Sequence, residues 1–490
     1  MTNSPIRLFN SLSRTVEPFA PIEPGHARIY SCGPTVYHYA HLGNLRAYVF
    51  TDTLRRALEY KGLETTHVIN ITDVGHLTSD ADAGDDKMEA AAAREKKTIW
   101  DIAAYYTTAF KADVAALNIR QPTRWSVATD HIDDMVNFAE KIAPEHCYEL
   151  PTGLYFDSST VPDYGSLARA VTDEGEGRIA EVGGKRHASD FAIWRKSPEG
   201  EQRQMEWESP WGKGAPGWHL ECSVMSIKYL GPQFDIHTGG IDHREIHHPN
   251  EIAQNQAFTG TSATGANWWM HNNFLVTRTS NEANNESGDG TAKMSKSKGE
   301  IATLQALVDR GVHPLAYRLM CLSAHYRSEL EFSGENLMAA LTRLKRLVMV
   351  VLPLRGNEDE VVLPPAAIAL LEKFDEAISD DLALPRALPL IEEAATTKAF
   401  RPAVRLHLVE RMDAVLGLRL DSIERIDLRL RPDNAPLTED DIEALLAARK
   451  DARATKDFAE SDRIRDNLVN AGVEVMDGDA LGWDWKLNLA

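Results

Sequence analysis

The segment Ala27-Arg28-Ile29-Tyr30 is a short apolar run that reaches Cys32 just before a Gly-Pro turn. An amphipathic stretch follows from about Leu45 to Tyr60, and Gly62 stands where a helix stop is expected. The next apolar run, residues 67–71, has the composition of a buried parallel strand. A strand, a helix and a second strand in this order predict a βαβ unit, and with it a doubly wound parallel α/β sheet.

Three polar positions fall where the strands of this unit end. Ligands bind outside the carboxyl ends of the strands in such a sheet, and Cys32, His41 and Thr72 lie at these ends. The tetrapeptide His41-Leu42-Gly43-Asn44 opens the predicted helix, so Gly43 lets the backbone approach a phosphate near a partly positive helix N-terminus. His41 and Asn44 are therefore predicted to donate hydrogen bonds to phosphate oxygens.

A second phosphate-binding motif, Lys293-Met294-Ser295-Lys296-Ser297, lies past the middle of the chain. It is cationic and rich in hydroxyl groups, so Lys293 and Lys296 can neutralise charge on a triphosphate. The polar, low-complexity stretch 279–290 precedes it, which predicts that the motif rides on a mobile lid. Together the two motifs predict a site that grips a triphosphate from both sides while charge builds on its α-phosphoryl group.

Length, charge and composition exclude several classes of protein. A chain of 490 residues predicts about three domains. The formal net charge of −20 argues against a generally basic nucleic-acid binder, although the local basic runs 343–346, 425–431 and 449–450 can contact polyphosphate. No apolar run approaches the ~20 residues that span a bilayer, and residues 1–7 lack signal-peptide features. We therefore expect a cytoplasmic protein without membrane association.

Four cysteines stand far apart without a CxxC pair, which excludes a disulfide scaffold and a zinc ribbon. A metal site assembled from distant segments stays open, because Cys222 precedes His247 and Glu251, which share one face if they lie on a helix. Thiolates, an imidazole and a carboxylate suit Zn²⁺. Buried core cysteines and structural histidines explain the same spacing at least as well, so spacing alone does not decide.

The organisation of the chain changes twice along its length. A tract rich in Gly, Pro and charge, from about 150 to 216, predicts an inserted module that returns to the sheet near Trp218. From about residue 333 the pattern is almost wholly helical, with one helical region expected from Ile442 to Val469 and a short strand at 473–476.

Several motifs together resemble one known family. They are residues 30–37, 70–73, 216–223, 235–242, 247–254, 293–297, 325–328 and 452–458. The chain resembles the cysteinyl-tRNA synthetases, a class I aminoacyl-tRNA synthetase family, over essentially its whole length. The resemblance implies a Rossmann-type doubly wound parallel sheet with an inserted module, followed by a mainly helical C-terminal half that includes an anticodon-binding domain.

The resemblance also implies a role for each matching residue. One zinc ion per subunit is expected on Cys32, Cys222, His247 and Glu251. The substrate cysteine would be surrounded by Thr35, Thr72, Trp218 and His237. ATP, with Mg²⁺, would be bound by Gly43, Gly239, Gly240, Asp242 and Lys296, and the phosphates would be activated by His41, Asn44, Lys293 and Lys296. The anticodon would be read by Arg453, Phe458, Asp462 and Asp477.

The implied domains follow the chain in order. They are the first catalytic half (1–140), the inserted connective module (141–210), the second catalytic half with the zinc ligands (211–275), the lid and stem-contact region (276–335), a helical bundle (336–432) and the anticodon-binding domain (433–490). The implied partners are tRNA(Cys), ATP and L-cysteine, and the chain is expected to be a monomer.

A zinc ion would solve a selection problem that an apolar pocket cannot. Serine differs from cysteine by one atom, and an apolar pocket discriminates such pairs by only about 1–3 kcal/mol. Accurate translation needs a ratio on the order of 10⁴, roughly 5.5 kcal/mol. Coordination ionises a thiol outright, whereas a serine hydroxyl is harder to ionise and a poorer ligand. The zinc is therefore assigned to substrate recognition, and a separate editing site is unnecessary.

Four features depart from the family's pattern. Asn44 stands where the family often has a second histidine, and Thr238 replaces a usual glycine. Residues 74–76 differ from the usual acidic continuation, and the polar insertion 279–292 lengthens the tether of the lid.

Two other functions remain to be weighed. A ligase that transfers cysteine from the same adenylate to an amino sugar would lack the C-terminal module that residues 433–490 match. A non-catalytic relative that binds tRNA or a protein would show damage to the phosphate-binding or zinc-binding residues, and both sets are complete apart from Asn44.

Overall fold

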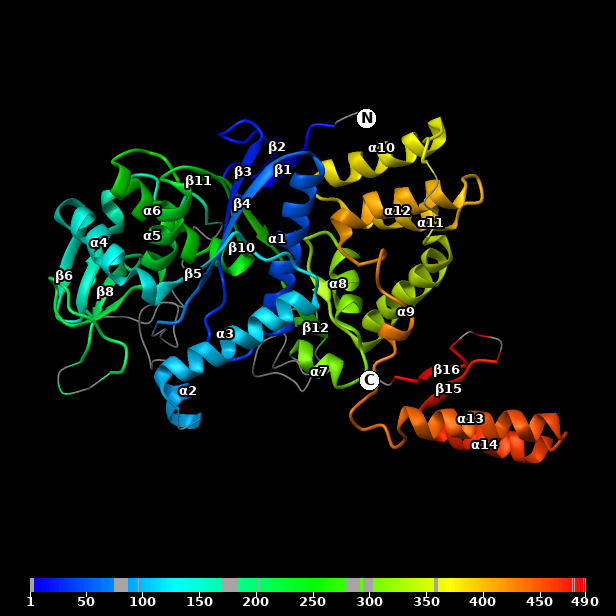
Figure 1. Cartoon of the computed structure of the whole chain (residues 1–490). Helices are drawn as coiled ribbons and strands as arrows, with labels where there is room; N and C mark the ends of the chain where they lie inside the picture. Colours follow the sequence, from blue (N-terminus) through cyan, green and yellow to red (C-terminus); the bar gives the residue numbers. More distant parts are fainter. Residues whose placement is uncertain are drawn as a thin grey trace.

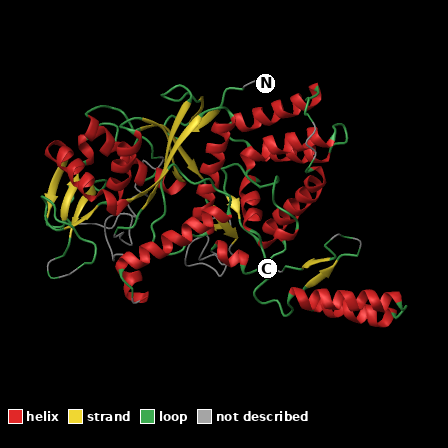
Figure 2. Ribbon diagram, viewed as in Figure 1, coloured by secondary structure: helices red, strands yellow, loops and turns green. Residues whose placement is uncertain are grey.

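A five-stranded sheet in which every paired strand is parallel lies at the centre of the catalytic half (Figures 1 and 2). The computed structural model describes residues 4–74, 87–95, 97–168, 183–198, 200, 203–278, 291–293, 303–356, 360–477, 479, 481–487 and 489. The strands, in spatial order, are β11 (Ala266–Asn272), β10 (Phe234–Gly240), β3 (His26–Ser31), β4 (Glu64–Ile71) and β5 (Arg124–Val127). The predicted doubly wound parallel sheet is confirmed.

Helices cover both faces of this sheet because its side chains alternate between two cores. Ile29 and Ile69 belong to the core shared with α1 (Leu42–Tyr60) and α3 (Ile99–Ala116). Their neighbours Tyr30 and Val68 face a second core. That second core is shared with α4 (Ile132–His146), α5 (Trp218–Leu230) and α6 (His247–Thr259), which lie on the other side of the sheet in Figure 1.

Helix α1 begins three residues earlier than the pattern predicts, because its first turn is capped from both sides. The backbone N–H of Asn44 donates to His41 Nδ1 at 3.1 Å, and the backbone N–H of His41 donates to Asn44 Oδ1 at 3.3 Å. This capping box satisfies donors that a helix start otherwise leaves unpaired. At the far end Lys61 is the C-cap and Gly62 follows with φ +86°, as expected for a glycine stop.

The predicted inserted module is a separate antiparallel sheet between β5 and α5. It contains β6 (Cys147–Leu150), β7 (Gly153–Phe156), β8 (Phe191–Lys196) and β9 (Gly214–Pro216), in that spatial order. It packs beside α4. Two further small sheets flank the core: β1 (Arg7–Asn10) with β2 (Thr15–Pro18), and β13 (Thr291–Lys293) with β12 (Leu275–Arg278) and β14 (Leu330–Glu331).

The described part of the chain after residue 333 is mainly helical (Figure 2). Along the chain, α2 (Lys87–Glu95) precedes α3, and α7 (Leu304–Val308) and α8 (Pro314–Leu322) lie between β13 and β14. The bundle contains α9 (Gly334–Val351), α10 (Pro365–Ser379), α11 (Leu384–Thr396) and α12 (Pro402–Leu416). Single 3₁₀ turns are η1 (Ala128–His131), η2 (Ser158–Thr160), η4 (Ile241–Arg244), η6 (Leu352–Leu354) and η7 (Ile426–Leu428).

The last domain is a pair of helices with a two-stranded sheet, set apart from the bundle in Figure 1. Its elements are α13 (Glu439–Ala454), α14 (Phe458–Asn470), β15 (Val473–Val475) and β16 (Trp483–Trp485). The single helical region expected from Ile442 to Val469 is therefore two helices. Lys456 has φ +60°, which ends the first, and the Asp457 side chain accepts the Glu460 N–H at the start of the second.

A buried ionic cluster joins the catalytic half to the helical bundle. Asp52 on α1 accepts from Arg56 Nε at 2.7 Å and from Arg318 Nη2 on α8 at 2.6 Å. Arg318 also donates to the carbonyl oxygen of Leu416, at the end of α12. Burial would raise the pKa of Asp52, but the two guanidinium groups hold it below its usual value.

Replacing Asp52 with Asn should destabilise the protein, because two buried guanidinium groups lose their counter-charge. Breaking such a pair costs about 3–5 kcal/mol. The shift of the urea midpoint measures the loss, and Glu460→Gln, which removes an exposed pair with Arg463, is the matched control that should barely change it. Equal midpoints for the two variants would contradict the prediction.

None of the helices in the described ranges has both the length and the hydropathy that crossing a bilayer requires.

Candidate active site and metal centre

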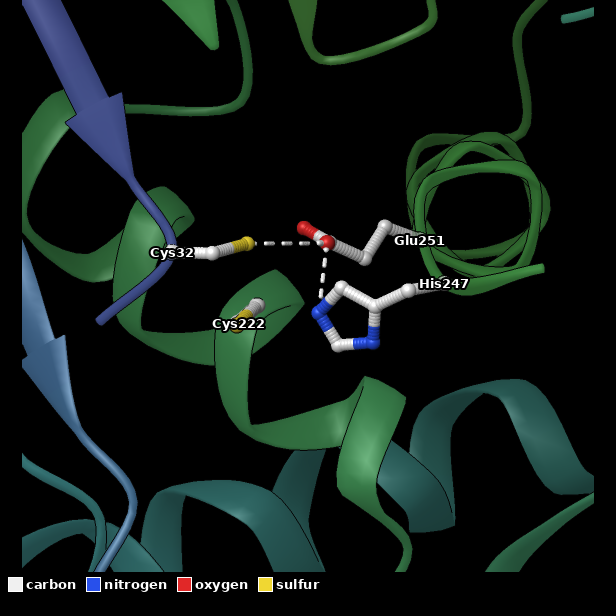
Figure 3. A group of neighbouring side chains, drawn as sticks. All are labelled: Cys32, Cys222, His247 and Glu251. Carbon is white, nitrogen blue, oxygen red and sulfur yellow. Dashed lines mark hydrogen bonds and ion pairs between the residues drawn. The ribbon is translucent and has the colours of Figure 1, made fainter. Parts of the chain in front are cut away.

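Four side chains that are remote in sequence converge at the carboxyl end of β3 (Figure 3). They are Cys32, Cys222, His247 and Glu251, and their ligand atoms all lie within 4.8 Å of one another. Glu251 Oε1 lies 4.0 Å from Cys32 Sγ and 3.1 Å from His247 Nε2. Cys32 directly follows β3, Cys222 lies on α5, and the other two share one turn of α6.

The local backbone explains why Cys32 reaches this place. Its N–H donates to the carbonyl oxygen of Thr238 at 3.2 Å, which continues the pairing of β3 with β10. The following residue, Gly33, donates to Asn70 Oδ1 at 2.6 Å. A Cβ on Gly33 would lie 1.5 Å from the carbonyl oxygen of Asn70, so only glycine lets the chain pass β4 here.

The four residues fit a metal ion by their chemistry and by the placing of the His247 ring. His247 Nε2 is buried and faces Glu251 Oε1 at 3.1 Å as an ion pair, without the geometry of a hydrogen bond. The other ring nitrogen, Nδ1, lies 2.8 Å from His219 Nδ1, which holds the ring in place. A ligating histidine typically has one nitrogen fixed by an outer partner and the other aimed at the metal. With two sulfurs and a carboxylate beside it, the set suits Zn²⁺.

The electrostatics of the cluster favour the ionised forms of Glu251 and Cys222 and the protonated form of Cys32. Burial would raise the pKa of Glu251, but His237 and His247 lower it to about 2. Burial would likewise raise the pKa of Cys222, but a hydrogen bond from Cys32 and the charge of His247 lower it to about 6. Burial and the neighbouring Cys222 raise the pKa of Cys32 well above its usual value. A bound cation therefore has to displace a proton from Cys32.

A cavity of about 520 Å³ opens beside this cluster, and several of the predicted phosphate, nucleotide and substrate residues line it. The predicted residues in its wall are Cys32, Thr35, His41, Gly43, Asn44, Trp218, Gly240 and Asp242. The structure thus brings the predicted first phosphate motif, the candidate ligand Cys32 that follows β3, and part of the expected nucleotide-binding run to one space.

Other predicted site residues lie behind the cavity wall. Thr72 is buried and donates to Glu221 Oε2 at 2.8 Å, and His237 Nε2 lies 2.9 Å from Glu251 Oε2. Gly239 has its backbone against His248, whose Cε1 would lie 2.7 Å from an added Cβ. Lys293 is described only as part of β13, and Lys296 lies outside the described residues, as does most of the expected lid.

Comparison with known proteins bears directly on this arrangement. Residues 18–342 match the model of the tRNA synthetases class I (C) catalytic domain, and residues 435–480 match the cysteinyl-tRNA ligase anticodon binding domain. A cysteine–tRNA ligase of Novosphingobium aromaticivorans is 61% identical over 99% of this chain and 98% of its own length. The chain belongs to the cysteine–tRNA ligase family. The resemblance expected from the motifs is confirmed.

Further relatives agree with this membership. The cysteine–tRNA ligase of Zymomonas mobilis is 56% identical over 99% of this chain and 98% of its own. Among solved structures, Mycobacterium tuberculosis methionyl-tRNA synthetase in complex with methionyl-adenylate has a TM-score of 0.52 at 12% identity, over 80% of this chain and 90% of that one. That likeness shows the class I synthetase fold alone.

Two departures from the family's pattern acquire a structural reason. The side-chain oxygen of Asn44 accepts from the His41 N–H in the capping box. The side-chain NH₂ group of Asn44 therefore stays available to donate to a phosphate. Thr238 is buried, and its hydroxyl lies 2.7 Å from that of Ser31 and 3.0 Å from that of Thr51. The hydroxyl therefore has partners between the sheet and α1.

A second group of possible ligands was missed by reasoning from the sequence. Cys32, His237, His248 and Glu251 also bring their ligand atoms within 4.8 Å of one another. His248 Nε2 lies 3.3 Å from Cys32 Sγ, and its Nδ1 lies 2.7 Å from His271 Nε2. The two groups share Cys32 and Glu251, so they form one centre. In the sequence, the adjacent pair His247-His248 is the feature that could have indicated this second group.

This second group continues as a buried chain of hydrogen bonds. His271 Nδ1 lies 2.8 Å from the hydroxyl of Ser11. Burial lowers the pKa of His248 and that of His271 well below the usual value, so both rings are neutral. A neutral ring donates from one nitrogen only. If the Ser11 hydroxyl donates to His271 Nδ1, the Nε2–H of His271 donates to His248 Nδ1. The Nε2–H of His248 then points at Cys32 Sγ.

The residues predicted to read the anticodon lie in the C-terminal domain, away from the central sheet in Figure 1. Asp477 accepts from Arg449 at 2.7 and 2.9 Å and from Arg453 at 3.1 Å. These guanidinium groups lower the pKa of Asp477 to about 2. Phe458 is 63% exposed at the start of α14, and Asp462 pairs with Arg465 on the same helix.

Proposed function

We propose that this chain attaches L-cysteine to tRNA(Cys) in two steps that consume ATP. The cysteine carboxylate attacks the α-phosphorus of ATP and pyrophosphate leaves, with Mg²⁺ sharing the charge. The terminal 2′-hydroxyl of the tRNA then attacks the carbonyl of the cysteinyl-adenylate and AMP leaves. The observation that carries this proposal is the buried cluster of two sulfurs, an imidazole and a carboxylate beside the cavity that holds the His41 loop.

The metal of this cluster is proposed to be zinc, one ion per subunit, on Cys32, Cys222, His247 and Glu251. When bound, zinc would supply a soft acceptor that prefers a thiolate to a hydroxyl. Trp218 supports a role for this wall of the cavity in recognition, because its ring lies 4.1 Å from that of His247 and it lines the cavity. Thr35 lines the same space, and Thr72 pairs with it through a short parallel bridge.

The chain's own groups are proposed to act by position and charge. His41, Asn44, Lys293 and Lys296 would bind the phosphates, and Gly43, Gly239, Gly240 and Asp242 would contact the nucleotide. Thr35, Thr72, Trp218 and His237 would bound the site of the amino acid, with His237 acting through Glu251. No side chain is required as a nucleophile.

Arg453, Phe458, Asp462 and Asp477 are proposed to read the anticodon. Their support is the match of residues 435–480 to the anticodon binding domain of the family. The monomeric state, the cytoplasmic location and the boundaries of the six domains stay predictions.

One experiment separates this function from its nearest rival. The purified chain is assayed for cysteine-dependent ATP–pyrophosphate exchange, then for transfer of cysteine to tRNA(Cys) or to an amino sugar. We expect exchange and charging of tRNA. Exchange with transfer only to the sugar would favour the rival, and absence of exchange would favour a non-catalytic relative.

Replacing His248 with Ala should weaken metal retention, because Cys32 would lose its buried hydrogen-bond partner. Outer partners of this kind typically contribute 10–100-fold to metal affinity. The rate of zinc release to a chelator measures the effect. His146→Ala, which removes a histidine of the inserted module, is the control and should release zinc at the wild-type rate. Identical release from both variants would refute the role of His248.

A further inference from the structure

Four aromatic rings from the loop before α1 and from α3 gather beside the cavity. His38 and Tyr39 come from the loop before α1, and Tyr105 and Tyr106 come from α3. We call them the rim cluster. His38, Tyr39 and Tyr106 line the cavity. The loop before α1 and helix α3 therefore form one aromatic surface at the edge of the cavity.

The rings of the rim cluster hold one another in fixed orientations. The rings of His38 and Tyr106 are parallel within 6° at 5.9 Å, and the ring of Tyr39 stands edge-on to that of Tyr106 at 5.0 Å. The hydroxyls of Tyr39 and Tyr105 are hydrogen-bonded at 2.5 Å. Tyr106 is buried and donates to Glu95 at 2.7 Å, so it is the anchor of the group.

Two of these rings are left in contact with water. Tyr39 is 36% exposed and Tyr105 is 47% exposed, and they lie side by side with ring centroids 6.1 Å apart. Lys97 places its ammonium 4.9 Å from the centre of the Tyr105 ring and 3.4 Å from Glu95 Oε2, and its side chain stays exposed. The edge of the cavity thus presents aromatic surface together with a cation, which is the combination that single-stranded nucleic acids bind.

We propose that Tyr39 and Tyr105 form a stacking surface for the unpaired 3′-terminal nucleotides of tRNA. This inference rests on the proposed function, in which the terminal ribose must reach an adenylate inside the cavity. The single-stranded end then has to cross the cavity's edge. Every base has a π-face, so stacking there needs no particular sequence, and Lys97 supplies a charge for a neighbouring phosphate.

The fixed geometry of the two rings favours this use. The hydrogen bond between their hydroxyls already restricts both side chains, so little conformational entropy remains to be lost on binding. Tyr105 does not line the cavity itself, which sets it beyond the space expected for cysteine and ATP. One base would stack on Tyr105, outside the cavity, and the next base toward the 3′ end would stack on Tyr39, which lines the cavity.

The test compares two steps of the reaction in the full-length enzyme. Tyr105→Ala removes the exposed ring, Tyr105→Phe keeps it, and Trp100→Ala removes another exposed ring of the same helix that lies outside the rim cluster. Each variant is assayed for ATP–pyrophosphate exchange and for single-turnover transfer from preformed cysteinyl-adenylate to tRNA(Cys). Binding is measured for the complete tRNA and for a transcript without its last three nucleotides.

We expect exchange within about twofold of wild type for Tyr105→Ala, and transfer reduced roughly 10-fold or more. Trp100→Ala should transfer at nearly the wild-type rate, and Tyr105→Phe, which keeps the ring but loses the hydrogen bond to Tyr39, should transfer at a rate between those of Tyr105→Ala and the wild type. The wild type should bind the complete tRNA more tightly than the shortened one, and Tyr105→Ala should bind the two equally.

Three results would overturn the inference. Normal transfer by Tyr105→Ala would do so while leaving the proposed function intact. A raised KM for ATP in exchange, with normal transfer, would mean that the ring serves the adenine. An equal loss in Trp100→Ala would assign the effect to α3 as a whole. Absence of exchange in the wild type would instead defeat the proposed function, and this inference with it.

Discussion

A Cys222→Ser variant is expected to lose the proposed zinc ion and the activation of cysteine together. The substitution replaces a soft thiolate ligand with a hydroxyl that stays protonated. Partners outside the metal's first set of ligands already contribute 10–100-fold. We therefore expect loss of a ligand itself to lower kcat/KM for cysteine-dependent pyrophosphate exchange by about 10³-fold or more. Metal analysis of the purified variant and the exchange assay measure the two losses.

Cys147→Ser provides the matched control for this experiment. Cys147 begins β6 of the inserted module, is partly buried, and is not one of the four clustered ligands. It should keep both the metal and the exchange activity. If Cys222→Ser retains its zinc, or activates cysteine at the wild-type rate without it, the cluster is not the recognition site.

Replacing Lys296 with Ala is expected to lower kcat for adenylate formation by about 10²- to 10³-fold. The removed ammonium would otherwise stabilise charge that develops on the phosphates in the transition state, and one such donor typically contributes this much. Zinc content should stay at the wild-type level, because the metal ligands are remote from the motif in sequence. Rapid-quench measurement of adenylate formation, with metal analysis on the same preparation, checks both statements.

A neighbouring lysine controls for the general charge of the segment. Lys298→Ala removes one positive charge just beyond the motif and should leave adenylate formation nearly unchanged. An equal drop in both variants would attribute the effect to net charge, and an unaffected rate in Lys296→Ala would remove this lysine from the phosphate site.

Reasoning from the sequence located the fold well where the signal is local. The run that reaches Cys32, the apolar stripe of α1 and the glycine after it are short-range patterns, and the structure confirms the βαβ unit they predict. It located the ends of elements less well. The capping box of His41 and Asn44 moved the start of α1, and the backbone of Lys456 divides the expected helical region 442–469 into two helices.

For the candidate site, the sequence shows which residue types are present, whereas only the fold shows which of them lie in contact. The two groups of possible ligands that share Cys32 and Glu251 become visible only in three dimensions. Ser11 and His271 carry no motif, and they enter the site only because β11 pairs beside β10 and the N-terminal segment crosses it. No short-range pattern encodes such contacts.

What the sequence determined by itself was which residue types are present: a histidine and an amide at the start of the first helix, a second motif with two lysines, and cysteine and histidine side chains of the kind that bind zinc. What only the tertiary structure decided was that Cys32 and Glu251, which are 219 positions apart, face each other across 4.0 Å. The physical reason is that helix and strand periodicity depends on near neighbours along the chain. Which strand ends lie next to each other depends on the order of the strands in the sheet. That order is fixed by the packing of the two cores on either side of the sheet.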